Sequence, residues 1–87
     1  MKTTTESKFY GKSQNIEAGG CFAINFFRPL TSTNPVSVNG IPLEAGQNLS
    51  IRQNVGDIDT TFYEVVFSSG AGNNELYVTR ILPIGNQ

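Results

Sequence analysis

Apolar and polar side chains alternate along several short stretches of this chain, and an alternation with a period of two residues is typical of β-strands. The clearest case is residues 21–28, Cys-Phe-Ala-Ile-Asn-Phe-Phe-Arg. Phe22, Ile24 and Phe26 fall on one face of this stretch and are predicted to point into a core. Residues 21–28 are therefore predicted to form a strand.

Residues 61–67 form a second run of strongly β-forming side chains, but here both faces are apolar. One face carries Tyr63, Val65 and Phe67, and the other carries Phe62 and Val66. Because a strand that is polar on neither face is typical of a buried position, this strand is predicted to be central and covered on both sides.

Glycine and proline punctuate the chain at intervals of roughly ten residues, which favours short strands over helices. Asn39-Gly40 lies between apolar residues and predicts a type I′ hairpin turn. Pro42 cannot donate a backbone hydrogen bond, so the strand that returns from this turn is predicted to be short or at a sheet edge. Residues 70–74 are predicted to be another hairpin turn.

Further strands are predicted at residues 9–16, 36–38, 41–43, 49–51 and 76–82. The polar residues 1–8 are predicted to be a flexible N-terminal arm, and residues 83–87 a tail. With six or seven strands and no helix, residues 1–87 are predicted to be a single all-β domain. The expected architecture is a small antiparallel β-sandwich, of which a minimal single jelly roll is one form.

The chain has 87 residues, one cysteine and no histidine. A domain of this size buries a small core, and small domains usually gain stability from disulfides, metals or partners. An internal disulfide needs two cysteines, and no group of side chains resembles a metal site. The composition therefore predicts that contacts between subunits supply part of the stability.

The formal net charge is −1, with six basic and seven acidic residues. No basic stripe indicates a nucleic-acid partner. No apolar run approaches the roughly 20 residues that span a bilayer, and residues 1–6 lack a hydrophobic signal region. The chain is therefore expected to be made in a cytoplasm without a signal peptide.

The residue types disfavour catalysis and cofactor binding. Without histidine, the usual nucleophile–base pairs and the commonest general base are missing. Cys21 is interpreted as a small buried hydrophobic residue rather than a nucleophile. Asp57 and Asp59 could begin a calcium loop, but turn chemistry explains them more simply, because Asp side chains accept hydrogen bonds from nearby backbone N–H groups.

The aromatic side chains are the remaining candidates for function. Two interpretations stay open: they fill a two-layer core, or some of them meet another protein, since tyrosine and phenylalanine are enriched in the centres of interfaces. The interface candidates are Phe27, Phe62, Tyr63, Tyr77 and Tyr10.

The segment from Val36 to Arg80 resembles small β-sandwich proteins encoded among the structural genes of bacterial viruses, especially those that infect Bacteroidetes. The resemblance covers about half of the chain. It is carried by Val-Asn-Gly-Ile-Pro-Leu, Ala-Gly-Gln-Asn-Leu-Ser-Ile, Gly-Asp-Ile-Asp-Thr-Thr-Phe-Tyr and Glu-Leu-Tyr-Val-Thr-Arg-Ile. It implies a minor capsid, penton or decoration protein of a bacteriophage virion, which forms a homo-oligomer and binds a larger capsid protein.

A second interpretation is a monomeric β-sandwich module that binds a carbohydrate or another ligand on an exposed aromatic platform. Tyr10, Phe27, Tyr63 and Tyr77 are its candidate residues. The two interpretations differ in their expected oligomeric state, because only the virion protein is expected to associate with copies of itself.

Overall fold

The computed structural model describes residues 2–84, and within them all regular secondary structure is β-strand. The described residues contain no helix with the length and hydropathy needed to cross a membrane. Eight strands follow one another within this described range, where the sequence predicts six or seven. They are β1 (Thr3–Tyr10), β2 (Gln14–Glu17), β3 (Ala23–Phe27), β4 (Val36–Val38), β5 (Ile41–Leu43), β6 (Asn48–Arg52), β7 (Phe62–Phe67) and β8 (Leu76–Pro83).

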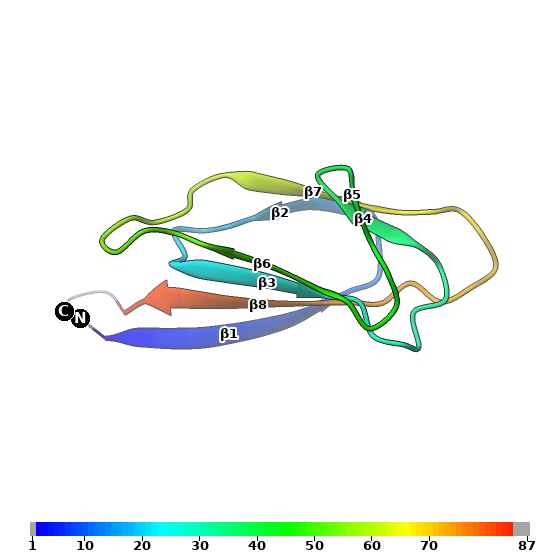
Figure 1. The fold of residues 1–87 in the computed structure, drawn as a ribbon, viewed down its shortest axis with the longest axis horizontal. Coiled ribbons are helices and arrows are strands. Elements are labelled where there is room, and N and C mark those ends of the chain that lie inside the picture. Colours follow the sequence, from blue (N-terminus) through cyan, green and yellow to red (C-terminus); the bar gives the residue numbers. More distant parts are fainter. Residues whose placement is uncertain (1, 85–87) are drawn as a thin grey trace.

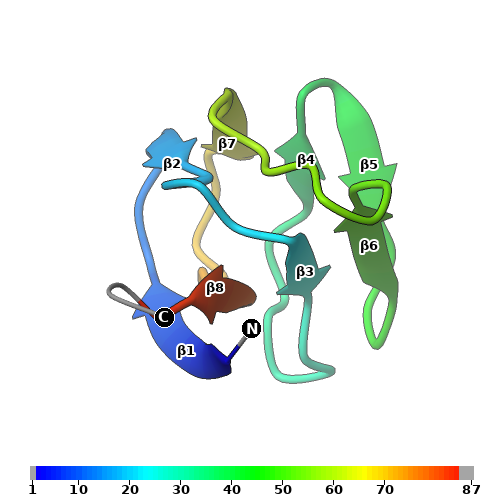
Figure 2. The same ribbon diagram turned by 90° about the vertical axis from the view of Figure 1, so that its left-hand side faces the viewer.

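The strands form two antiparallel sheets that face each other, with the orders β1-β8-β3-β6 and β2-β7-β4-β5. Figure 2 shows the two layers, with β2, β7, β4 and β5 above the other four strands. Of the seven connections, only the β4–β5 turn stays within one sheet, and the other six cross between the sheets. This is the strand order of a jelly roll, so the predicted β-sandwich is confirmed.

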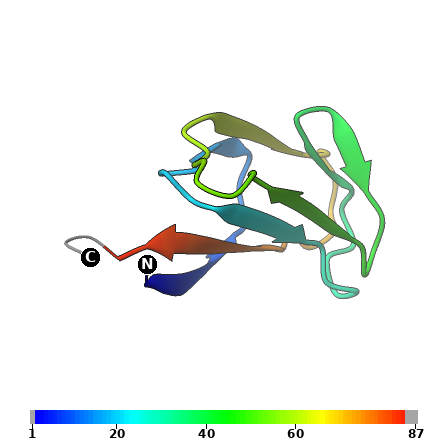
Figure 3. The same ribbon diagram turned by 60° about the vertical axis from the view of Figure 1, so that its left-hand side comes forward.

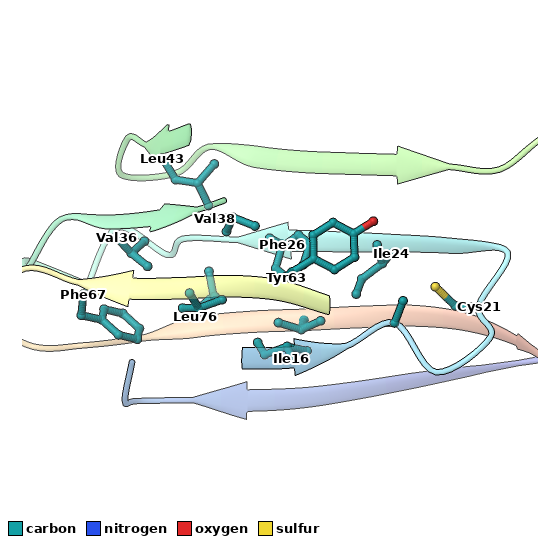
Figure 4. Packing of buried hydrophobic residues seen from close by; sticks show 13 residues of the cluster. Ile16, Cys21, Ile24, Phe26, Val36, Val38, Leu43, Tyr63, Phe67 and Leu76 are labelled. Atoms are coloured by element: carbon teal, nitrogen blue, oxygen red, sulfur yellow. The ribbon is translucent and has the colours of Figure 1, made fainter. Parts of the chain in front are cut away.

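The core lies between the two sheets and takes alternate side chains from each strand, as the two-residue period requires. Ile24 and Phe26 of β3 are almost fully buried, as predicted, whereas Phe22 is only partly buried. Figure 4 shows Phe26 beside Tyr63 of the opposite sheet, with ring centroids 5.2 Å apart. This aromatic contact joins the two layers at the centre of the molecule.

The Asn39-Gly40 turn forms as the sequence predicts. Both residues have positive φ, 51° and 82°, which is the requirement of a type I′ turn. Asn39 Oδ1 also accepts a hydrogen bond from the backbone N–H of Glu64 at 2.8 Å, which ties the turn to β7. Pro42 lies in β5, which is an edge strand of three residues, so that prediction is confirmed as well.

The N-terminal arm is where the sequence prediction is wrong. Residues 3–8 belong to β1, which pairs with β8 along its whole length, from Thr3 opposite Pro83 to Tyr10 opposite Leu76. Most side chains of β1 are exposed. Because backbone pairing rather than burial holds this strand in place, its side chains carry no apolar alternation for the sequence to reveal. Met1, and residues 85–87 of the predicted tail, lie outside the described residues.

Residues 9–16 are not one strand. Phe9 and Tyr10 end β1, Gly11 begins a short connection, and β2 starts at Gln14 in the other sheet.

The outer face of β7 also differs from its prediction. β7 is central in its sheet, but Phe62 is 59% exposed and Val66 43%, since no segment within residues 2–84 covers that face.

Residues 70–74 link β7 to β8 across the two sheets and are not a hairpin turn. They lie against the Ser/Thr-rich loop before β4, where the buried Asn34 side chain holds them. Asn34 Nδ2 donates to the Gly72 carbonyl at 3.1 Å, and its Oδ1 accepts from the Gly72 N–H at 3.2 Å. This two-way hydrogen bonding closes one end of the sandwich.

Candidate interaction surface

Three aromatic side chains form a row on the outer face of the β1-β8-β3-β6 sheet. Tyr77 of β8 lies opposite Phe9 of β1 on one side and opposite Phe27 of β3 on the other. Directly opposed residues of antiparallel strands share one face of the sheet. Leu76 and Val78 point into the core, so Tyr77 and both its partners point outward.

This aromatic row is accessible to a partner. Phe9 is 54% exposed and Tyr77 42%, and Phe27 is half-buried. The rings of Phe9 and Tyr77 meet edge to face, with centroids 5.4 Å apart and planes 60° apart. Edge-to-face packing holds the two rings in a fixed arrangement, so the row is a preformed apolar surface.

Beside the aromatic row lies a row of small polar side chains, which crosses all four strands. It consists of Ser7, Thr79, Asn25 and Ser50, in the order β1-β8-β3-β6. Ser7 Oγ and Thr79 Oγ1 lie 3.1 Å apart, and the Ser50 hydroxyl donates to Asn25 Oδ1 at 2.6 Å. These hydrogen bonds between side chains fix the polar row across the sheet.

A third row of outward positions crosses the same four strands and consists of Thr5, Ile81, Ala23 and Arg52. Arg52 carries the only charge among the paired outward positions of this sheet. The outer face therefore presents an apolar strip and a neutral polar strip side by side. A neutral surface with exposed aromatic side chains is depleted of charge in the same way as the centre of a protein interface.

The outer face of the β2-β7-β4-β5 sheet is different. Phe62 and Val66 are exposed there, but they are four residues apart on β7 and Glu64 lies between them. Phe62 pairs with Glu17, and Glu64 with Asn15. Carboxylates thus interrupt the apolar side chains, and no aromatic row forms among the paired positions.

The structure separates the five aromatic residues that the sequence singles out. Phe27 and Tyr77 are neighbours in the aromatic row, and Phe62 lies alone on the opposite outer face. Tyr63 is buried between the sheets, and Tyr10 packs against the core. Only Phe27, Tyr77 and Phe62 therefore remain accessible to a partner.

Sequence reasoning missed Phe9 as a surface residue. Neighbouring residues of a strand point to opposite faces, so of the adjacent Phe9 and Tyr10 one had to point outward. The sequence carries this signal. It could not show which of the two points outward, because that depends on the register between β1 and β8.

A cluster of hydrogen-bonded polar groups lies where the chain enters β7, and it includes the buried Asp59 and Tyr63. Asp59 is 5% exposed and accepts hydrogen bonds from the Thr61 N–H at 2.9 Å, the Thr61 hydroxyl at 2.6 Å and the Tyr63 hydroxyl. The backbone of Asp59 also pairs with that of Cys21. The hydrogen bond from Thr61 N–H is the turn chemistry predicted for Asp59.

The ionisation of these groups suits a structural role. Burial opposes the charge on Asp59, but the hydrogen bonds from Thr61 and Tyr63 outweigh it and hold the pKa of that carboxyl below its ordinary value. Burial, with the hydrogen bond to Asp59, raises the pKa of Tyr63 to about 12. Burial and the nearby Asp59 carboxylate raise the pKa of the Cys21 thiol, which makes it a poor nucleophile.

Among the described residues, no three histidine, cysteine, aspartate or glutamate side chains gather in a way that could hold a metal ion. Asp57 is exposed, and its N–H donates to the Asn54 carbonyl at 2.9 Å within the β6–β7 loop.

Comparison of the chain with protein-family models, with curated protein sequences and with solved structures finds no match.

Proposed function

We propose that this protein is a structural component of a virus particle, of the minor capsid, penton or decoration type, which associates with copies of itself and with a larger capsid protein. The proposed contact surface is the outer face of the β1-β8-β3-β6 sheet. The observation that carries the proposal is the aromatic row Phe9–Tyr77–Phe27, which stands exposed on a nearly uncharged sheet.

The fold is in keeping with this role. Jelly rolls occur in viral capsid domains, although they also occur in lectins and other proteins, so the topology alone does not select a function. The resemblance of residues 36–80 to structural proteins of bacterial viruses adds weight to the capsid role. No signal peptide is expected in such a protein, because particles assemble in the host cytoplasm.

The energetics of the aromatic row also favour association. Leaving a large apolar side chain in water forgoes roughly 1.5–3 kcal/mol relative to burying it fully. Within the chain, Phe9 and Tyr77 leave about half of their surface in water. A second subunit that covered the row would recover part of this free energy without any change in the fold.

Carbohydrate binding is the second candidate, and one observation favours it: the aromatic row lies next to a row of hydrogen-bonding side chains. A sugar ring uses both kinds of contact. However, the 60° angle between the rings of Phe9 and Tyr77 does not give a coplanar platform on which a sugar could stack. The assembly role is therefore the better account of this face.

The experiment that tests the proposed function is quantitative mass spectrometry of purified virus particles from the source of this sequence. The chain is expected at a fixed ratio to the major capsid protein, and a ratio equivalent to about 60 copies per particle would indicate the five-fold vertices of an icosahedral shell. Absence of the chain from particles that contain all other structural proteins would contradict the proposal.

A further inference from the structure

The free edge of β1 is the longest unprotected strand edge in the described structure. β1 has eight residues and no proline, and it lies at the end of its sheet. The other edge strands are β6 with five residues, β2 with four and β5 with three, and β5 contains Pro42. Figure 1 shows β1 as the lowest strand, with no strand below it. An edge of this kind is a template for pairing with another strand.

The backbone groups at this edge can be assigned. The Ile84 N–H donates to the Lys2 carbonyl at 3.1 Å, so the backbone groups of Lys2 point toward β8. In an antiparallel ladder the residues of a strand alternate in the side toward which their N–H and C=O groups point. The groups of Thr4, Glu6 and Lys8 therefore also face β8, and those of Thr5, Ser7 and Phe9 face the free edge.

The sequence of β1 is self-complementary about Ser7. In an antiparallel pair of two β1 strands with Ser7 opposite Ser7, Glu6 of each copy lies opposite Lys8 of the other. Thr5 then lies opposite Phe9. The hydrogen-bonded positions of this register are Thr5, Ser7 and Phe9, which are the residues whose backbone groups are free.

The two charge pairs fall at the positions where side chains approach most closely. Glu6 and Lys8 occupy non-hydrogen-bonded positions of this register, where opposed Cα atoms are only about 4.5 Å apart. Opposite charges at such positions stabilise a strand pair. In the single chain Glu6 forms an ion pair with Arg80, whereas Lys8 is exposed on β1.

We infer that two copies of this chain associate by antiparallel pairing of their β1 strands, centred on Ser7, to form one continuous eight-stranded sheet. Charges at a strand edge normally deter pairing, but here Glu6 and Lys8 deter other strands and favour a second copy of β1. A two-fold axis perpendicular to the sheet keeps the outer faces of both copies on the same side. The two aromatic rows then lie on one shared surface, and in this respect the inference deepens the proposed assembly role and rests on it.

Cysteine scanning tests the register. In the paired dimer the Cα atoms at position 7 of the two copies are about 5.5 Å apart, within disulfide reach, so Ser7→Cys is expected to form a covalent dimer under mild oxidation. The matched control is Thr5→Cys, because in this register the two residues at position 5 lie more than about 13 Å apart along the strands. Cys21 is buried and does not interfere.

A mixture of Thr5→Cys and Phe9→Cys chains sharpens the test, since these positions face each other in the proposed register. The mixture is expected to give the mixed disulfide at least tenfold faster than Thr5→Cys gives its own dimer. Equal rates for Ser7→Cys and Thr5→Cys would overturn the inference, because they would show random collision of exposed thiols.

Charge reversal gives an independent readout. Lys8→Glu places like charges opposite Glu6 twice in the dimer and is expected to weaken it by about tenfold or more, from the usual strength of cross-strand pairs. Lys12→Glu, in the exposed loop beyond β1, is the control of equal charge change. Equal dimerisation of both variants would contradict the inference.

The proposed function and this inference can fail separately. A chain that is present in virus particles, but whose Ser7→Cys variant forms no disulfide dimer, retains the virion role and loses the β1 pair. A chain that forms the β1 pair in solution but is absent from particles retains the pair and loses the virion role.

Discussion

The two outer faces of this sandwich are built from the same kind of strand but differ in how their apolar side chains are arranged. On the β1-β8-β3-β6 sheet, Phe9, Tyr77 and Phe27 are cross-strand neighbours. On the β2-β7-β4-β5 sheet, Phe62 and Val66 lie along one strand and carboxylates stand between and beside them. Each face therefore exposes aromatic surface, but only the first concentrates it.

This difference shows that exposure of single residues is a poor guide to an interface. Phe62, at 59%, is more exposed than Tyr77, at 42%. Isolated exposed apolar side chains are normal on protein surfaces, whereas a contiguous apolar patch indicates a partner. The register between strands decides which exposed apolar side chains become neighbours, so the register rather than single exposures indicates where a contact surface lies.

The largest expected effect comes from removing the core contact that supports both faces. Phe26 is fully buried and packs on Tyr63 of the other sheet. Phe26→Ala is expected to lower the free energy of unfolding by about 3–5 kcal/mol. Phe27→Ala, one residue along and pointing outward, is expected to lower it by less than about 1 kcal/mol. Urea denaturation followed by circular dichroism measures both, and equal losses would contradict the assignment of inner and outer faces.

The next largest effect separates the two outer faces directly. Tyr77→Asp places a charge in the middle of the aromatic row and is expected to weaken association by about 2 kcal/mol or more, roughly thirtyfold, as at interface hot spots. Phe62→Asp makes the same kind of change on the opposite face and is expected to leave association unchanged. Native mass spectrometry measures the fraction of species larger than the β1-paired dimer, and circular dichroism checks the fold. A larger effect of Phe62→Asp would move the contact surface to the other sheet.

A smaller effect is expected at the buried carboxylate that anchors the start of β7. Asp59→Asn removes the charged hydrogen-bond acceptor of Thr61 and Tyr63. The expected loss of unfolding free energy is at most about 1.5–3 kcal/mol, because asparagine retains one acceptor oxygen. Thermal unfolding measures the loss. Association through the aromatic row is expected to persist, since Asp59 does not lie on that face.

The same carboxylate makes stability depend on pH. The pKa of Asp59 is lower in the folded chain than its ordinary value of 3.8, so its contribution to stability is fully present above about pH 4 and is lost as the pH falls through the folded pKa. The fall in unfolding free energy below pH 4 is therefore expected to be smaller in Asp59→Asn than in the native chain. Identical acid profiles would contradict the assignment.

The smallest expected effect concerns the polar row. Asn25→Ala removes hydrogen bonds to Ser50 and Asn48, and the expected loss of stability is about 0.5–1 kcal/mol, since these bonds are exposed to water. Asn15→Ala on the opposite outer face is the matched control. Equal stabilities of the two variants in chemical denaturation would show that the hydrogen bonds of the polar row do not stabilise its sheet.

The parts of the fold that could be predicted are those encoded by neighbouring residues. The Asn39-Gly40 turn, the alternation of Ile24 and Phe26, and the hydrogen bond of Asp59 within its own turn all depend on contacts a few residues apart. Each of these signals depends only on residues close together in the sequence, so it can be recognised without knowing which strands pair.

The parts that could not be predicted depend on pairing between distant strands. β1 shows no apolar alternation, because backbone pairing with β8 along its whole length holds it in place rather than a buried face. The aromatic row likewise exists only because Phe9, Tyr77 and Phe27 come into register from three separate strands. Tyr63 and Tyr10 looked equivalent to Tyr77 in the sequence, since composition does not reveal which face of a strand the chain covers.

Sedimentation velocity of the native chain over a range of concentrations tests self-association most directly. A shift from the monomer of 9.5 kDa to oligomers larger than the β1-paired dimer is expected as the concentration rises. Tyr77→Asp is expected to stop at the dimer, and Phe62→Asp is expected to retain the larger oligomers. A native chain that never forms a species larger than the dimer at any concentration would contradict self-association through this face.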